Sequence, residues 1–92
     1  MALLSDGQVA AGLEGREWRR EGDAIVRDWR FADFGAAIMF VERVAEVAEA
    51  SNHHPDILVH GWNKVRLTLS THSEGGITAA DLALAQRLDS LG

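Results

Sequence analysis

Residues 33 to about 50 carry the strongest helical signal in this sequence, and they limit what the chain can fold into. Asp33 is a suitable N-cap residue for a helix that runs to about Ala50. At helical spacing the apolar residues cover an arc of roughly 180°, wider than the roughly 100° stripe that a surface helix needs to pack on one core. These residues are Phe34, Ala37, Ile38, Phe40, Val41, Val44, Ala45, Val47 and Ala48. The pattern fits either a deeply buried helix or one whose Phe40 and Val47 pack on another subunit. We favour the second, because a chain of 92 residues has little protein with which to bury a helix on two sides.

Two pairs of short segments with alternating apolar and polar residues predict β-hairpins on either side of this helix. The segments are residues 18–20 with 24–31 and residues 57–62 with 64–72. In the last segment Val65, Leu67 and Leu69 alternate with polar residues, so one face of that strand is expected in the core. Arg27 interrupts the apolar face of strand 24–31, and His72 is expected to close the final strand on its polar side.

Capping-box patterns predict a shorter helix near each end of the chain. Ser5 precedes Gln8 by three residues and begins a helix to about Leu13, and Thr78 precedes Asp81 by the same spacing and begins the last helix. The predicted order is therefore α-β-β-α-β-β-α. Because strands joined as hairpins pair antiparallel, we expect an α+β fold with a four-stranded antiparallel sheet and the helices packed on one face. A single domain should cover residues 1–92.

Composition excludes several classes of function. The chain has 14 acidic and 9 basic residues, a formal net charge of -5, and no Lys/Arg cluster of the kind that nucleic-acid-binding proteins use. It contains no cysteine, which excludes disulfides and thiolate metal sites and suits a reducing compartment. Neither a signal peptide nor a membrane-spanning run is recognisable. We therefore expect a cytoplasmic protein without direct nucleic-acid or membrane partners.

The residues most suited to chemistry gather at the end of the long predicted helix. Glu49 and His53 are one helical turn apart, and His54 precedes Pro55, the only proline, which disfavours further helix. His72 comes from a strand that must pair with the strand leaving this corner. Imidazoles give and take protons near neutral pH, and a neighbouring carboxylate can orient them. The set therefore favours acid–base chemistry.

A metal centre is a competing interpretation of the same residues. In number, Glu49, His53, His54 and His72 could bind zinc or iron. Adjacent histidines usually diverge, however, and two histidines at i and i+4 on one helix are absent. A metal-dependent enzyme is therefore the weakest of the alternatives.

The spacing of these residues resembles the signature of the pterin-4a-carbinolamine dehydratases, also called dimerisation cofactors of a homeodomain factor. The matching pattern is Glu49, His53-His54-Pro55, Trp62, His72 and Asp81. The flanking segments Trp62-Asn63-Lys64-Val65, Leu69-Ser70-Thr71-His72 and Gly75-Gly76-Ile77-Thr78 are also similar to the family.

This resemblance implies dehydration of 4a-hydroxytetrahydropterin to quinonoid dihydropterin, a step in recycling tetrahydrobiopterin or another pterin after aromatic amino-acid hydroxylation. The pterin is then the substrate, and no cofactor or metal is expected. The implied catalytic residues are His53, His54, His72 and Glu49, and the implied substrate-binding residues are Asn52, Pro55, Trp62 and Asp81. Trp62 and Asp81 also have structural explanations, as a hairpin residue and a helix-capping residue.

The resemblance further implies a homodimer or homotetramer built through sheet edges and helix packing, which agrees with the wide apolar arc of the long helix. An aromatic amino-acid hydroxylase pathway is the implied setting. The alternative function is a non-enzymatic protein-interaction or coactivator module on the same fold.

Overall fold

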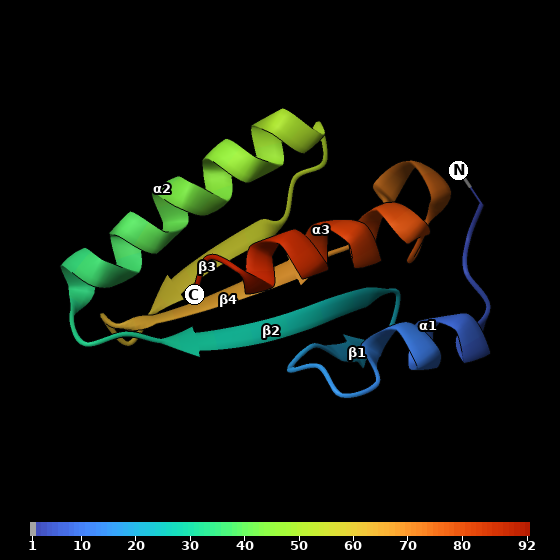
Figure 1. Cartoon of the computed structure of the whole chain (residues 1–92), viewed down its shortest axis with the longest axis horizontal. Helices are drawn as coiled ribbons and strands as arrows, with labels where there is room; N and C mark the ends of the chain where they lie inside the picture. Colours follow the sequence, from blue (N-terminus) through green and yellow to red (C-terminus); the bar gives the residue numbers. More distant parts are fainter. Residues whose placement is uncertain (1) are drawn as a thin grey trace.

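The helices and strands follow one another in the predicted order, with one short addition (Figure 1). The computed structural model describes residues 2–92. Its elements are α1 (Asp6–Leu13), β1 (Arg19–Glu21), β2 (Ala24–Arg30), α2 (Phe34–Ser51), β3 (Asp56–His60), β4 (Lys64–Leu69), the 3-10 helix η1 (His72–Glu74) and α3 (Ala79–Asp89). The addition is η1, and it falls where the last strand was expected to continue.

The four strands form one antiparallel sheet in the order β1-β2-β4-β3, so β2 and β4 are central and β1 and β3 are edges. Register places Ile25 opposite Leu69 and Trp29 opposite Val65. Directly paired residues share a face, and these four are buried. Helices α2 and α3 cover that face, and the opposite face carries no helix (Figure 1). The predicted fold class is confirmed.

Helix α2 begins and ends close to its predicted bounds. Asp33 is the N-cap, and its carboxylate accepts a hydrogen bond of 2.8 Å from the N–H of Ala36, which satisfies one of the free donors of the first turn. Its large exposed apolar residues are Phe34 and Met39, which are 54% and 57% exposed. Within residues 2–92, no helix combines the length and apolarity that crossing a bilayer requires.

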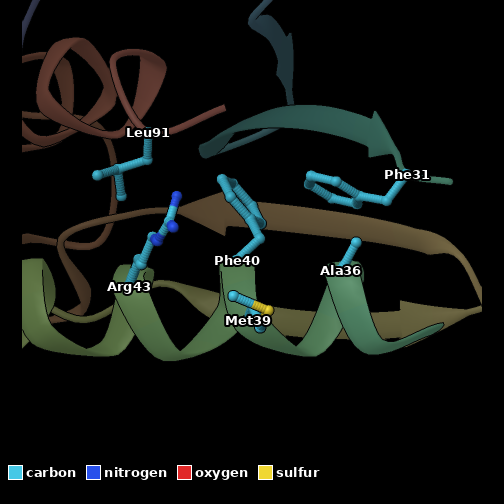
Figure 2. Close-up of a pocket in the computed structure, with 6 residues that line it drawn as sticks. All are labelled: Phe31, Ala36, Met39, Phe40, Arg43 and Leu91. Carbon is cyan, nitrogen blue, oxygen red and sulfur yellow. The ribbon is translucent and has the colours of Figure 1, made fainter. Parts of the chain in front are cut away.

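An open groove runs beside the middle of α2 (Figure 2). It has a volume of about 200 Å³. Figure 2 shows α2 contributing one side of the groove, with Phe31 and Leu91 on the other. The lining residues are Phe31, Ala36, Met39, Phe40, Arg43 and Leu91. The surplus apolar surface of α2 therefore lies around Met39.

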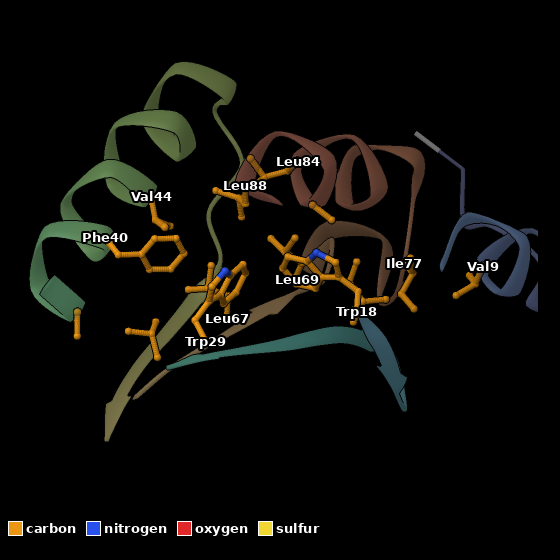
Figure 3. Packing of buried hydrophobic residues seen from close by; sticks show 14 residues of the cluster. Val9, Trp18, Trp29, Phe40, Val44, Leu67, Leu69, Ile77, Leu84 and Leu88 are labelled. Atoms are coloured by element: carbon orange, nitrogen blue, oxygen red, sulfur yellow. The ribbon is translucent and has the colours of Figure 1, made fainter. Parts of the chain in front are cut away.

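The hydrophobic core lies between the sheet and the two covering helices (Figure 3). Phe40 is 3% exposed, and its ring centroid lies 4.9 Å from that of Trp29 and 5.0 Å from that of Phe31. Val47 is half-buried and also packs against the core. The expectation that Phe40 packs on another subunit is therefore wrong, because its ring packs on Trp29 and Phe31 in its own chain. For Val47, which keeps part of its surface exposed, the expectation stays a prediction.

Arg27 points into the core side of the sheet, as its position in the pattern indicated, but it is not left unpaired. Its guanidinium lies 4.3 Å from the centroid of the Trp29 ring and donates a hydrogen bond of 2.5 Å to Asp89. The indole N–H of Trp18 donates to the same carboxylate at 2.7 Å. Asp89 is the last residue of α3, where the helix dipole disfavours a negative charge. These donors offset that cost and attach the end of α3 to β2.

Candidate active site

The end of α2 turns the two adjacent histidines in different directions. The C-cap residue Asn52 has φ 49° and ψ 40°, in the left-handed region that asparagine tolerates better than most residues. The N–H of His53 bonds to the carbonyl of Ala48 at 3.2 Å, which closes the helix. Because the helix ends at Ser51, His53 does not continue its spiral, and the chain leaves through Pro55 into β3.

His53 is bound to Asp81, the buried acid in the first turn of α3. The distance from His53 Nε2 to Asp81 Oδ1 is 2.6 Å. Asp81 is 0% exposed, whereas the His53 side chain is 18% exposed. An ionised Asp81 accepts but does not donate; in that state the Nε2–H of His53 donates and its Nδ1 is left for another partner. The ring therefore has one fixed orientation with an edge near the surface.

Two threonines complete the environment of Asp81. The N–H of Thr78 donates to Asp81 Oδ2 at 2.9 Å, which confirms the predicted capping box, and the Thr71 hydroxyl donates to the same oxygen at 2.8 Å. The Thr71 and Thr78 hydroxyls are 2.8 Å apart. Both carboxylate oxygens thus have donors, as a buried charge requires. The capping pattern identified Thr78, but nothing in the sequence indicated Thr71 or the bond to His53.

His54 is the histidine that pairs with Glu49. The distance from His54 Nε2 to Glu49 Oε2 is 2.9 Å, and both side chains are largely exposed, at 56% and 78%. Glu49 does not bond to His53, although the two are one helical turn apart in the sequence, because the left-handed Asn52 removes His53 from the helical position at i+4. An ion pair this exposed orients the ring only weakly.

His72 begins η1, and the prediction that it closes a strand is wrong. Strand β4 ends at Leu69, because Thr71 instead pairs with Gly76 and closes a tight loop, with an N–H to carbonyl distance of 2.8 Å. His72 is exposed and borders a hollow of about 320 Å³. The other lining residues are Asp23, Ala24, Asp56, Thr68, Ser70 and Gly75. Of these, Asp56 follows the His53-His54-Pro55 corner directly along the chain.

The remaining candidates are not all at the same end of the molecule. Asn52 is exposed beside the histidines and Pro55 is half-buried. Trp62 is 62% exposed and lies in the turn at the far end of β3, with φ 58°. A bulky residue in the left-handed region is strained, and such strain is often found at functional positions. Within one chain, the length of β3 separates Trp62 from His54.

The histidines do not converge as ligands of one ion. His53 and His54 are held by different carboxylates, and His53 borders a different hollow, together with Ser51, Ala80, Ala83, Leu84 and Arg87. Within residues 2–92, no three His, Asp or Glu side chains are grouped closely enough to hold a metal.

Comparison with known proteins gives consistent matches along the whole chain. The model of a family described as "Pterin 4 alpha carbinolamine dehydratase" matches residues 2–91. A relative from Thermomicrobium roseum is 50% identical over 99% of this chain and 98% of its own length, and one from Mycobacteroides abscessus is 52% identical over 97% and 95%. Both are provisionally named pterin-4-alpha-carbinolamine dehydratases.

Two solved structures are also similar. The crystal structure of a transcriptional coactivator/pterin dehydratase from Brucella melitensis has a TM-score of 0.90 and 32% identity, over 97% of both chains. A pterin dehydratase-like protein identified as a RuBisCO assembly factor in the alpha-carboxysome has a TM-score of 0.70 and 25% identity, over 84% of this chain and 90% of its own.

Proposed function

Because the chain belongs to the pterin 4 alpha carbinolamine dehydratase family, we propose that it dehydrates 4a-hydroxytetrahydropterin to quinonoid dihydropterin by histidine acid–base catalysis. The observation that carries this proposal is the 2.6 Å bond between His53 and the buried Asp81. A ring held in one orientation and one tautomer is prepared for proton transfer, whereas a freely rotating surface histidine is not.

The reaction requires one proton donor and one proton acceptor. The bond between carbon 4a and its hydroxyl oxygen breaks, and the oxygen keeps the electron pair and takes a proton to leave as water. A ring nitrogen loses a proton, and the electron pair of that N–H bond forms the new carbon–nitrogen double bond. Electrons are conserved within the substrate, so nothing is oxidised or reduced. Histidine side chains supply both proton transfers at neutral pH.

The proposed roles follow from how each side chain is held. His53, His54 and His72 transfer protons, with the Nδ1 atom of His53 free to face the substrate because its Nε2–H is committed to Asp81. Glu49 gives His54 a weak preferred orientation through their exposed contact. Asp81 is fully buried, so it acts as a positioning residue for His53 rather than as a substrate contact. We place the pterin ring between the His53-His54 corner and the hollow beside His72, which Asp56 lines directly after that corner in the chain.

Purified wild-type protein should accelerate the loss of the 4a-carbinolamine absorbance when the substrate is generated in the cuvette. The rate should stay the same after dialysis against a chelator, because the proposed proton transfers use side chains alone. A rate no faster than the uncatalysed one would contradict the proposed activity, and a rate lost on chelation and restored by zinc or iron would favour a metal-dependent enzyme instead.

We also propose that the active form is a homodimer or homotetramer. Strand β3 is an edge strand whose residues Ile57 and Leu58 are 38% and 51% exposed, and such an edge can pair with another chain. If two copies of β3 paired antiparallel, the Trp62 end of one copy would lie beside the His54 end of the other. That arrangement would make Trp62 a substrate contact across the interface.

The substitution Leu58→Lys should convert the oligomer to a smaller species in analytical ultracentrifugation, because a lysine on an edge strand opposes pairing. Met39→Lys is the matched substitution on α2. It should lower the size of the sedimenting species only if the subunits also associate through α2. An unchanged sedimentation coefficient for Leu58→Lys would contradict assembly through β3.

A second candidate function is a non-enzymatic interaction module. The groove beside Met39 favours it, since exposed apolar surface of this kind often binds another protein. The two similar structures also carry coactivator and assembly-factor descriptions.

For the enzymatic function, we propose a cytoplasmic role in pterin recycling beside an aromatic amino-acid hydroxylase.

A further inference from the structure

The open face of the sheet carries three basic side chains in one row across three adjacent strands. Arg30 of β2 lies directly opposite Lys64 of β4, and Lys64 lies directly opposite His60 of β3. Their chain neighbours Trp29 and Val65 are buried on the helix-covered face, so the alternation of a strand places the row on the other face. Like charges directly opposite each other destabilise a sheet. The pairing of Arg30 with Lys64 therefore needs an explanation outside folding.

The nearest acidic side chain is already engaged. Asp28 accepts from Arg66 Nε at 2.8 Å and from Arg19 Nη1 at 3.0 Å. The hydrogen bond from Arg66, followed by that from Arg19, lowers the pKa of Asp28 below its usual value. Among the ion pairs within residues 2–92, none includes Arg30 or Lys64. This end of the face therefore has surplus positive charge in a chain whose formal net charge is -5.

The row borders a concave site. Arg30, His60 and Lys64 line a hollow of about 310 Å³ together with Asp28, Trp29 and Arg66. This volume is in the range of small-molecule sites. It is separate from the hollow beside His72, because no residue lines both. Lys64 of the row lies four positions along β4 from Thr68 of that other hollow, roughly 13 Å away.

We propose that this hollow binds the phosphate group of a small organic phosphate. Neighbouring strands lie about 4.8 Å apart, so three donors in one row surround a single compact anion. The guanidinium of Arg30 can bind two phosphate oxygens, Lys64 a third, and His60 contributes a ring N–H. An acidic peptide fits less well, because alternate side chains of an extended chain are about 7 Å apart and could not converge on this row. The site goes beyond the dehydration of a pterin and does not depend on it.

Titration of ¹⁵N-labelled protein with inorganic phosphate and with pyrophosphate, followed by NMR, tests the proposal. We expect saturable shifts at residues 30, 60 and 64, with affinity lowered at least about ten-fold in Arg30→Gln and in Lys64→Gln. Arg43→Gln is the matched control, since Arg43 is an exposed arginine of α2 outside the row, and it should bind like the wild type. The apo variants Arg30→Gln and Lys64→Gln should also melt about 2 °C higher, because the repulsion between strands is removed.

Three outcomes would overturn the site. Sodium chloride at equal ionic strength could produce the same NMR shifts at residues 30, 60 and 64. That result would show that the shifts come from general ionic screening and not from a phosphate site. Arg30→Gln and Lys64→Gln could bind phosphate as tightly as the wild type. Hexaglutamate could bind at this face where phosphate and pyrophosphate do not, which would assign the row to an acidic protein partner instead. A melting temperature that falls in both variants would show that the basic pair stabilises the sheet, and would remove the argument from repulsion.

Discussion

Replacing His53 by alanine should reduce the turnover of 4a-hydroxytetrahydropterin by about 10²- to 10⁴-fold, the usual contribution of a positioned acid–base group. His53 is the histidine whose orientation the fold controls, through its 2.6 Å bond to Asp81. His72→Ala should cause a loss of the same order, because His72 is the histidine that borders the hollow beside the proposed pterin position. The measurement is the initial rate of carbinolamine loss at saturating substrate.

His60→Ala is the comparison for this prediction, since it removes the fourth histidine of the chain from a hollow that none of the other three lines. It should lower the rate far less than His53→Ala or His72→Ala does. Far-UV circular dichroism and a melting curve must show that the His53 variant is folded, because truncation leaves the buried Asp81 without one partner. Wild-type rates in the His53 and His72 variants would contradict histidine catalysis. Inactive variants that still bind a partner protein would show that an interaction function exists beside the enzyme.

Replacing Asp81 by asparagine should lower turnover by about 10²-fold or more while leaving the KM nearly unchanged. The amide can still accept the N–H of Thr78, but it then presents its NH₂ group to His53. The His53 ring must respond by accepting at Nε2 and carrying its proton on Nδ1, the atom proposed to face the pterin. A change of tautomer alters proton transfer more than binding, so the loss should appear in kcat.

Asp81→Ala should affect folding as well, because it leaves the Thr78 N–H and the Thr71 hydroxyl without their acceptor. We expect a cost of about 3 kcal/mol, which corresponds to roughly 15 °C in the melting temperature of a domain of this size. Asp33→Asn, at the N-cap of α2, is the matched control. It should change neither the turnover nor the melting temperature appreciably. If Asp81→Asn kept full turnover, the positioning role of Asp81 would be disproved.

The order and type of the helices and strands could be predicted because local patterns determine them. Ser5 with Gln8 and Thr78 with Asp81 form the two capping boxes observed, and Val65, Leu67 and Leu69 are buried as their alternation indicated. The last strand was predicted too long because its polar residues continue the alternation, whereas the bridge from Thr71 to Gly76 that ends it depends on the loop geometry.

The residues of the site could be named from spacing, but their partners could not. The one-turn spacing places His53 near Glu49, but one left-handed residue, Asn52, turns His53 away, and Glu49 bonds to His54 instead. The correct partner of His53 is 28 residues away in sequence, and only the packing of α3 against the end of α2 brings it near. The same limitation applied to Phe40, whose burial depends on contacts with Trp29 and Phe31, which are distant in sequence.

Helix α3 is attached to the rest of the molecule by a carboxylate at each end: Asp81 bonds to His53 at its start, and Asp89 bonds to Arg27 and Trp18 at its finish. Local opening of this helix must break one of these attachments, so α3 should open only as a cooperative unit and rarely. Any movement that admits or releases a ligand near His53 is therefore expected in the segment from Asn52 to Pro55 and not in α3. The fold thus holds Asp81 rigidly where it orients His53, and it leaves conformational freedom to the segment from Asn52 to Pro55.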